Sequence, residues 1–370
     1  MRVALITNDT RFAYNLRREA LFAMASEDHE VFLVADNIGY EEELKSLGIK
    51  LVEMKVDRRG QNPFSDISLF FRLWKTLRKL RPQIVFTNNA KPNVYGGIAC
   101  QLLRIRYVPN VTGLGTPLEQ PGKLQKLTAF LYKTGVRGAY AAFFQNSENL
   151  LFFEQRHMLS AKTKVIMLPG SGVNLEARSV LPYPSERPIV FLYVARIMKE
   201  KGIDVFLDVA RHFRAFRSDV SFEICGQCDD PKYLRVLEDL QKDGIVVYHG
   251  LQNDLTPFYQ RCSCFLYPSY YPEGMSNVLL EAAASGRPVI ACDRSGCRET
   301  VDDGKSGYVV SPNDSEDTIK AVEKFLKLTR EEQHKMGLAG RKKMEDEFDR
   351  KMVVSEYLKM LKDEKVHDQL

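Results

Sequence analysis

Short apolar runs alternate with longer amphipathic stretches along this chain of 370 residues. In the first half the runs predict strands at residues 2–7, 30–35, 50–54, 83–87, 107–112, 141–145 and 164–168, with helices between most of them. In the second half they predict strands at 189–194, 220–225, 245–249, 264–267, 288–292 and 307–310, and helices at 202–216, 231–242, 275–285 and 314–328. Such alternation is typical of doubly wound parallel sheets. The pattern therefore predicts an α/β protein with two Rossmann-like domains.

A segment rich in proline and glycine separates the two halves. Residues 169–187 contain three prolines and two glycines, a composition that favours a linker. We therefore predict a first domain at residues 1–170, a linker at 171–187 and a second domain at 188–345. A charged amphipathic helix is predicted at 346–370, with apolar residues at helical spacing at Phe348, Met352, Val353, Tyr357 and Leu361.

The stretch Glu273–Glu281, E-G-M-S-N-V-L-L-E, follows the predicted strand 264–267 and leads into a helix. If that helix starts near Met275, Glu273 precedes its first turn and Glu281 lies about two turns in, ~10 Å further along the axis. The partial positive charge at a helix N-terminus favours a phosphate group. The N–H groups that would offer it are those of Gly274, Met275, Ser276 and Asn277. Two carboxylates flanking such donors suit the hydroxyl groups of a nucleotide-sugar.

A basic loop, V-A-R-I-M-K-E-K-G, follows the predicted strand 189–194. Its Arg196 and Lys201 can converge on a pyrophosphate, and a guanidinium group matches phosphate oxygens well. A basic loop by itself is usually a solvated surface, and two glutamates at a helix start are by themselves an ordinary feature. Their occurrence together, each after a predicted strand, favours a nucleotide-sugar site.

This pairing resembles the donor site of retaining family-four glycosyltransferases of the GT-B fold, in which two Rossmann-like doubly wound domains face across a cleft. The resemblance covers essentially the whole chain and is strongest between residues 188 and 312. It implies that Arg196 and Lys201 bind the diphosphate, Glu281 the ribose hydroxyls and Glu273 the transferred sugar, with the backbone after Glu273 completing the phosphate site. It also implies that the C-terminal helix crosses back to the first domain, although a surface helix of the second domain is the alternative.

Polar loops at the carboxyl ends of the first-half strands are candidates for the acceptor side, because ligands of such sheets bind there. Two of them, K-P-N-V-Y-G-G and T-G-L-G, are similar to stretches in family members that build lipid-linked glycans and capsules. Many relatives carry a histidine before the first stretch, where this chain has Thr87, Asn88 and Asn89, so no general base is assigned. Turns and helix caps would explain these loops about as well as binding. The candidates are Asn8, Arg17, Asn88, Lys91, Gly113, Gly115 and Thr116.

Charge is unevenly distributed along the chain. Residues 1–182 carry a net charge of +9 and the remainder −4. No nucleic-acid recognition motif accompanies the basic half. An anionic membrane surface or a lipid diphosphate suits it better. The sequence shows no span of about 18 apolar residues, no signal-peptide core and no metal or disulfide spacing among its seven cysteines. We therefore expect a cytoplasmic protein at the inner face of the membrane.

The predicted helix Asp66–Arg81 is both apolar and basic. Its apolar stripe of Ile67, Phe70, Phe71, Trp74, Leu77 and Leu80 is accompanied by Arg72, Lys75, Arg78, Lys79 and Arg81. A basic amphipathic helix can lie on an anionic membrane. Packing against the first sheet explains the stripe equally well. The stretch Lys123–Arg137 adds further aromatic and basic residues and favours the membrane.

No strict D-x-D motif occurs, so no metal ion and no other cofactor is expected, and the basic residues must meet the charge of the leaving diphosphate. The resemblance implies transfer with retention. The leading hypothesis is transfer of a hexose or N-acetylhexosamine from a UDP-sugar to a polyprenyl-diphosphate-linked glycan. One alternative is the same reaction on a soluble acceptor, a sugar phosphate or a glucan. Another is a non-catalytic nucleotide-sugar-binding module.

Overall fold

A computed structural model describes residues 1–57, 63–114, 118, 122–184 and 187–365 of the chain. The chain forms two units. Unit 1 comprises Met1–Gly172, Pro272–Met275 and Arg350–Leu370, and unit 2 comprises Val173–Tyr271 and Ser276–Asp349.

Unit 1 is built on a parallel seven-stranded sheet in the order β3-β2-β1-β4-β5-β6-β7. Its strands are β1 Arg2–Asp9, β2 Glu30–Asp36, β3 Lys50–Glu53, β4 Ile84–Asn88, β5 Arg106–Val111, β6 Ala141–Phe144 and β7 Lys164–Met167. Its helices are α1 Thr10–Ser26, α2 Glu41–Ser46, α3 Pro63–Leu80, the π-helical turn η1 Pro92–Gly96, α4 Gly97–Leu103, α6 Lys123–Val136, α7 Ser147–Gln155 and α14 Arg350–Lys365.

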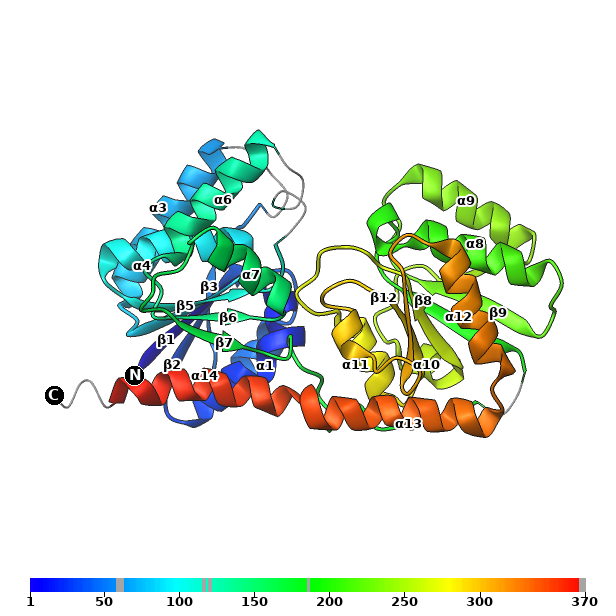
Figure 1. The fold of residues 1–370 in the computed structure, drawn as a ribbon. Helices are drawn as coiled ribbons and strands as arrows, with labels where there is room; N and C mark the ends of the chain where they lie inside the picture. Colours follow the sequence, from blue (N-terminus) through cyan, green and yellow to red (C-terminus); the bar gives the residue numbers. More distant parts are fainter. Residues whose placement is uncertain (58–62, 115–117, 119–121, 185–186, 366–370) are drawn as a thin grey trace. The chain divides into compact units, whose positions relative to one another are not determined.

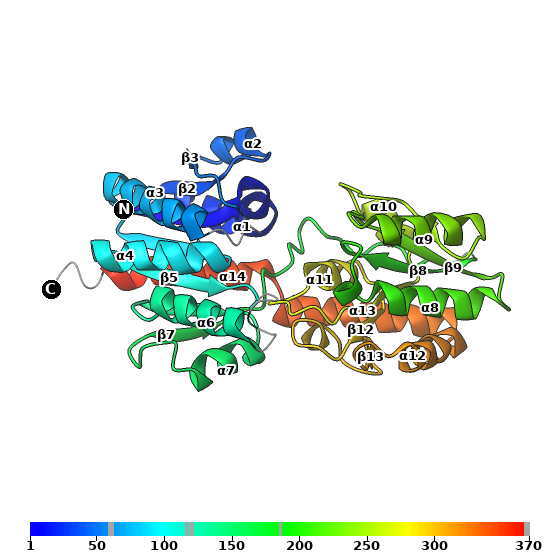
Figure 2. The same cartoon turned by 90° about the horizontal axis from the view of Figure 1, so that it is seen from above.

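Helices cover both faces of this sheet, as Figures 1 and 2 show. One core joins the sheet to α1 and to α14, which contributes Val353, Tyr357, Met360 and Leu361. The opposite core joins it to α3 and α4, with Leu69, Leu73 and Leu77 of α3 buried. Residues of α14 thus complete the hydrophobic core on one face of a sheet whose first strand is β1.

Unit 2 is built on a parallel six-stranded sheet in the order β10-β9-β8-β11-β12-β13. Its strands are β8 Ile189–Val194, β9 Val220–Cys225, β10 Val247–Tyr248, β11 Cys264–Tyr267, β12 Val289–Cys292 and β13 Gly307–Val310. Its helices are α8 Ile203–Arg214, α9 Pro231–Lys242, α10 Thr256–Arg261, α11 Asn277–Ala284, α12 Ser315–Lys327 and α13 Arg330–Glu347, with 3-10 turns η2 Lys199–Lys201 and η3 Arg298–Thr300. Its core packs α8, α9 and α12 against the sheet.

The predicted α/β fold class is confirmed, because each unit has a Rossmann-like fold built on a parallel sheet. Every predicted strand is present, although the one expected at 245–249 is reduced to Val247–Tyr248. The predicted start of a helix near Met275 is wrong, because α11 begins at Asn277. Glu281 therefore lies about one turn into the helix and not two.

The chain passes from unit 1 to unit 2 between Gly172 and Val173 and returns between Asp349 and Arg350, and the short segment Pro272–Met275 within this stretch is also assigned to unit 1. Most of the stretch predicted as a linker is held on unit 2. The buried guanidinium group of Arg287 donates to the carbonyl oxygens of Leu181 (3.1 Å) and Pro182 (2.7 Å). The connection itself is therefore short.

Candidate functional site

The order of strands in unit 2 reverses between β8 and β11. From β8 the chain moves outward through β9 and β10, and from β11 it moves outward on the other side. Ligands of doubly wound sheets bind at the carboxyl ends of the strands at such a reversal. The loops that begin here are the two that the sequence singles out, after Val194 and after Tyr267.

The loop after β8 carries Arg196 and Lys201. Arg196 is exposed, whereas Lys201 is only 8% exposed. The loop ends at Gly202, which has a φ of +75° and where a Cβ would lie 2.2 Å from the carbonyl oxygen of Pro268. Glycine is therefore required where the loop packs against the end of β11 and turns into α8.

The Lys201 ammonium group contacts two tyrosines, Tyr267 at the end of β11 and Tyr271 in the loop after it. Its Nζ atom lies 3.2 Å from the hydroxyl oxygen of Tyr267 and 4.5 Å from the ring centre of Tyr271. The Tyr193 hydroxyl donates to the Lys201 carbonyl oxygen at 3.1 Å. These tyrosines help to fix the position of the Lys201 side chain, and a fixed cation can stabilise an anion with little reorganisation.

The N-terminus of α11 lies after the same β11 loop. Ser276 is its N-cap residue, and the Ser276 N–H donates to the Gly296 carbonyl oxygen at 2.8 Å. The N–H groups of the first turn, from Asn277 onward, have no partner within the helix. Among the described residues, the buried Ser276 Oγ and Asn277 Oδ1 atoms have no hydrogen-bond partner. Unsatisfied buried polar atoms are costly, so they indicate a place where a polar ligand belongs.

Glu281 makes an ion pair that the sequence did not reveal. Its Oε2 atom lies 3.1 Å from Nη2 of Arg178 and 3.4 Å from the hydroxyl oxygen of Tyr259. Burial raises the pKa of Tyr259 well above its ordinary value, so this hydroxyl stays protonated and can donate to the carboxylate. Arg178 and Tyr259 belong to no motif and lie far from Glu281 in sequence. Only the fold brings them together.

Glu273, Gly274 and Met275 belong to unit 1. Hydrogen bonds to other residues of unit 1 hold the backbone of Glu273 and Gly274. The Gly274 N–H donates to the Thr112 carbonyl oxygen at 3.1 Å. The Asn146 side-chain amide donates to the carbonyl oxygens of Glu273 (3.0 Å) and Gly274 (2.7 Å). The Gly274 N–H is therefore occupied and does not offer the predicted phosphate contact in this structure.

Asn146 and the loop after β12 were missed by the sequence reasoning. Asn146 directly follows the predicted strand 141–145. The loop after β12 holds Ser276 through Gly296. Applying the rule of carboxyl-terminal strand ends to β6 and β12 would have pointed to both.

In unit 1 the strand order reverses between β1 and β4. Asn8 lies at this point, and its N–H donates to Oδ1 of Asn89 at 3.3 Å. Lys91 follows β4, and its Nζ atom lies 2.7 Å from Oδ1 of Asp66. Gly113 has a φ of +140°, which favours glycine at this position after β5.

Arg17 and Asn88 are buried beside α14. Arg17 Nε donates to Asn88 Oδ1 at 3.0 Å, and the Tyr357 hydroxyl lies 3.4 Å from the same oxygen. Arg17 Nη2 and Asn88 Nδ2 have no partner among the described residues. The acceptor-side role of these residues stays a prediction. Gly115 and Thr116 lie outside the described residues.

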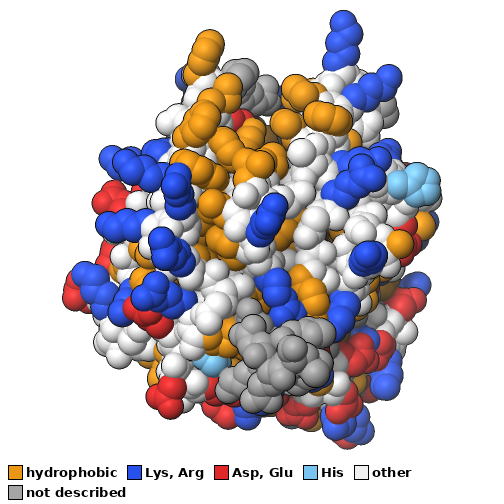
Figure 3. Space-filling view, turned by 90° about the vertical axis from the view of Figure 1, so that its left-hand side faces the viewer, with side chains coloured by type: hydrophobic (Ala, Val, Ile, Leu, Met, Phe, Trp, Pro, Cys, Tyr) orange, Lys and Arg blue, Asp and Glu red, His pale blue; other side chains and the backbone are white. Residues whose placement is uncertain are grey.

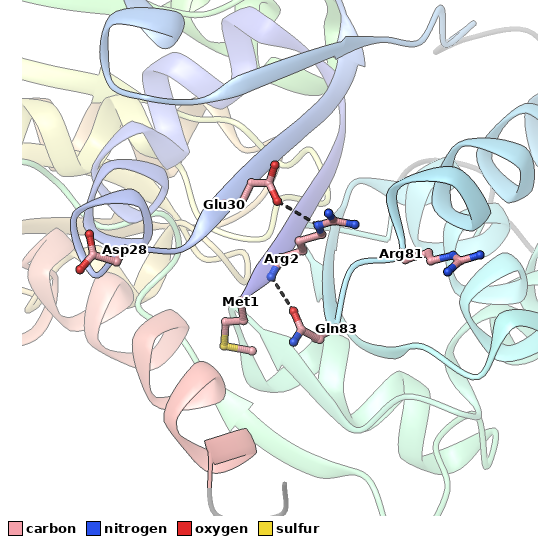
Figure 4. Close-up of a pocket in the computed structure, with 6 residues that line it drawn as sticks. All are labelled: Met1, Arg2, Asp28, Glu30, Arg81 and Gln83. Atoms are coloured by element: carbon pink, nitrogen blue, oxygen red, sulfur yellow. Dashed lines mark hydrogen bonds and ion pairs between the residues drawn. The ribbon is translucent and has the colours of Figure 1, made fainter.

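A hollow of about 510 Å³ opens at the opposite ends of the unit 1 strands, beside the amino ends of β1 and β2. Figure 4 shows Arg2 between Glu30 and Gln83 in its wall, with the Arg2–Glu30 ion pair at 2.9 Å. Its place at the amino ends of the strands separates it from the candidate residues. Among the described residues, no group of His, Cys, Asp and Glu side chains could hold a metal ion.

Comparisons with known proteins agree with this fold. A family model described as glycosyl transferases group 1 matches residues 180–343, and one described as glycosyl transferase 4-like matches residues 2–146. The chain is 26% identical to the N,N'-diacetylbacillosaminyl-diphospho-undecaprenol alpha-1,3-N-acetylgalactosaminyltransferase of Campylobacter jejuni, over 97% of this chain and 98% of that protein. It is 24% identical to the capsular polysaccharide biosynthesis glycosyltransferase CapM of Staphylococcus aureus, over 85% of each.

Solved structures share the whole architecture. HepE of Anabaena, in complex with UDP and glucose, superposes with a TM-score of 0.79 at 17% identity, over 98% of this chain and 100% of that one. Sucrose-phosphate synthase from Thermosynechococcus elongatus gives a TM-score of 0.79 at 18% identity, over 99% of this chain and 100% of that one.

Proposed function

The chain belongs to the group 1 glycosyltransferases with the GT-B fold, and from this premise we propose that it transfers a sugar from a UDP-sugar to a polyprenyl-diphosphate-linked glycan with retention of configuration. The donor side is supported by the place of three groups in unit 2: the loop with Arg196 and Lys201 follows β8, and the N-terminus of α11 follows the loop after β11, at the reversal of strand order. Cationic and N–H donors at such a point suit a diphosphate. The transferred sugar is a hexose or an N-acetylhexosamine.

Charge on the departing diphosphate is met by Arg196, Lys201 and the first turn of α11, without a metal ion. The bond between the anomeric carbon and the diphosphate oxygen breaks, and the acceptor oxygen bonds to the same face of that carbon. The leaving phosphate oxygen takes the proton of the acceptor hydroxyl. This step needs no protein base, which agrees with a chain in which none is assigned.

Glu281 is proposed to accept hydrogen bonds from the ribose hydroxyls. Arg178 and Tyr259 already orient its carboxylate, so the ribose would meet a fixed acceptor. Glu273 is proposed to contact the hydroxyls of the transferred sugar. The Asn146 bonds to the Glu273 and Gly274 carbonyl oxygens would hold its backbone in place.

Two observations support a polyprenyl-diphosphate-linked glycan as the acceptor. Unit 1 contains most of the basic half of the chain, and the Campylobacter jejuni relative is named for an undecaprenol-diphosphate-linked acceptor. We place the enzyme at the inner face of the cytoplasmic membrane, held peripherally. The other acceptor class, a soluble sugar phosphate or glucan, remains the alternative that the experiment below distinguishes.

Calorimetric titration with UDP-, GDP- and ADP-sugars should show binding of the UDP-sugars alone. Adding a polyprenyl-diphosphate-linked sugar should then release UDP, and sugar phosphates or glucans should not. Release with only a soluble acceptor would replace the proposed acceptor. Binding with no release on any acceptor would reduce the protein to a nucleotide-sugar-binding module.

Glu281→Ala should weaken UDP and UDP-sugar binding alike, whereas Glu273→Ala should spare UDP and remove the additional affinity that the sugar provides. The reason is that the ribose is common to both ligands and the hexose is not. Titrating each variant with both ligands measures this, with Glu323→Ala, an exposed glutamate of α12, as a comparison. Equal losses for both ligands in both variants would rule out the division of roles.

A further inference from the structure

The helices α3 and α6 carry large apolar side chains in solvent. Their exposed fractions run from 46% for Leu124 to 82% for Phe64. We call these residues, with the basic residues beside them, the α3–α6 face. Its apolar members are Phe64, Ile67, Phe71, Leu124, Leu127 and Phe130.

The expected single apolar stripe of the first of these helices is in fact two. Leu69, Leu73 and Leu77 are at most 3% exposed and pack on the unit 1 sheet. Ile67 and Phe71, which belong to the apolar stripe expected from the sequence, are 54% and 58% exposed. Packing on the sheet therefore accounts for the buried leucines and not for Ile67 and Phe71.

The second helix repeats this division. Tyr132 and Val136 of α6 are fully buried, while Leu124, Leu127 and Phe130 point to solvent. Both helices lie on the same face of the unit 1 sheet, with α4 between them (Figure 2). Figure 3 shows hydrophobic side chains gathered along and between two ridges at the top of the molecule, with Lys and Arg side chains on both flanks.

Within α3 and α6 the charged side chains are almost all basic. Helix α6 contains no Asp or Glu. The single acidic residue of α3, Asp66, is paired with Lys91 at 2.7 Å and accepts a hydrogen bond from Tyr95 at 2.8 Å. The basic members of the face are Arg72, Lys75, Arg78, Lys79, Lys123, Lys126 and Lys133.

We propose that the α3–α6 face inserts its apolar side chains into the interfacial layer of an anionic phospholipid bilayer. Large exposed apolar patches mark contact surfaces. A second copy of the chain is a poor occupant, since it would bring two basic surfaces together. An anionic bilayer offers acyl chains for the apolar ridges and lipid phosphates for the basic flanks. The proposal rests on the proposed function, because a lipid-linked acceptor is presented at such a surface.

Co-sedimentation of the full-length protein with phosphatidylglycerol-containing vesicles tests insertion. Changing Ile67, Phe71 and Phe130 together to Ser should weaken binding at least tenfold at both low and high salt. Changing Arg72, Lys75 and Lys79 together to Gln should weaken it mainly at low salt, where exposed charges are least screened. The control is Phe216→Ser with Leu338→Ser, which removes two exposed apolar side chains from unit 2 and should change nothing.

If the serine variant bound vesicles as well as the wild type does, the proposed insertion of these apolar side chains would be wrong. If the wild type bound phosphatidylcholine vesicles equally well, the proposed preference for an anionic bilayer would be wrong. A lipid-free dimer that the serine variant abolishes would replace the bilayer by a second copy. UDP-sugar binding by calorimetry should be the same in every variant. A variant that loses vesicle binding but still binds the donor therefore tests the α3–α6 face. A protein that still binds vesicles but releases no UDP would instead count against the proposed function.

Discussion

Lys201→Ala should lower the turnover rate by two to three orders of magnitude, because removal of a preorganised charge-stabilising donor costs roughly 3–4 kcal/mol. The buried ammonium group is already oriented by Tyr267 and Tyr271, so water cannot take its place equally well. Lys201→Met should have the same effect while keeping the apolar stem of the side chain. Arg196→Ala should produce a loss of similar size.

Initial rates with saturating donor and acceptor measure this effect, with thermal unfolding to show that each variant is folded. Lys199→Ala is the matched control, since Lys199 is an exposed lysine of the same loop and should be replaceable. A folded Lys201→Met protein with near-normal turnover would exclude Lys201 from the diphosphate site.

Tyr357→Ala should destabilise unit 1 by about 3–5 kcal/mol, the usual cost of removing a large aromatic side chain from a core. The Tyr357 ring is fully buried and lies 4.8 Å from the ring centre of Phe86 and 5.1 Å from that of Phe143. Tyr357→Phe should cost only about 1 kcal/mol, because it removes the hydroxyl that accepts from Asn110 but keeps the packing.

Urea unfolding followed by tryptophan fluorescence reads this effect directly, because the single tryptophan, Trp74, lies in α3 of unit 1. Met352→Ala, on the exposed side of α14, is the control and should be nearly neutral. An unchanged midpoint for Tyr357→Ala would mean that α14 does not contribute to the stability of unit 1.

The alternation of apolar runs was enough to predict both sheets, because a buried parallel strand needs a continuous apolar segment and little else. The place of the loops that carry Arg196, Lys201 and Glu273 could also be predicted, since they follow strands whose ends meet at the reversal of strand order, but the role of these residues in donor binding stays a prediction. Arg196 and Lys201 lie within six residues of each other, so local spacing already brings them close.

What the sequence could not show depends on residues far apart in the chain. The start of α11 is set by the bond from Ser276 to the Gly296 carbonyl oxygen, which no local pattern contains. The pairing of Glu281 with Arg178 joins residues more than one hundred positions apart. Helix α3 has apolar residues on more than one face, and periodicity alone does not tell which of them meets the sheet.

The burial of Tyr357 among Phe86 and Phe143 has a consequence for biosynthesis. During translation, the strands of the unit 1 sheet emerge well before α14, so their core lacks this helix until residues 350–365 have left the ribosome. All of unit 2 precedes Arg350 in the chain, so its own core is complete earlier. The core of the unit 1 sheet is therefore completed after the core of unit 2, although its strands are synthesised earlier. Until then, the sheet face that α14 covers exposes apolar side chains, which the nascent chain or a chaperone must shield.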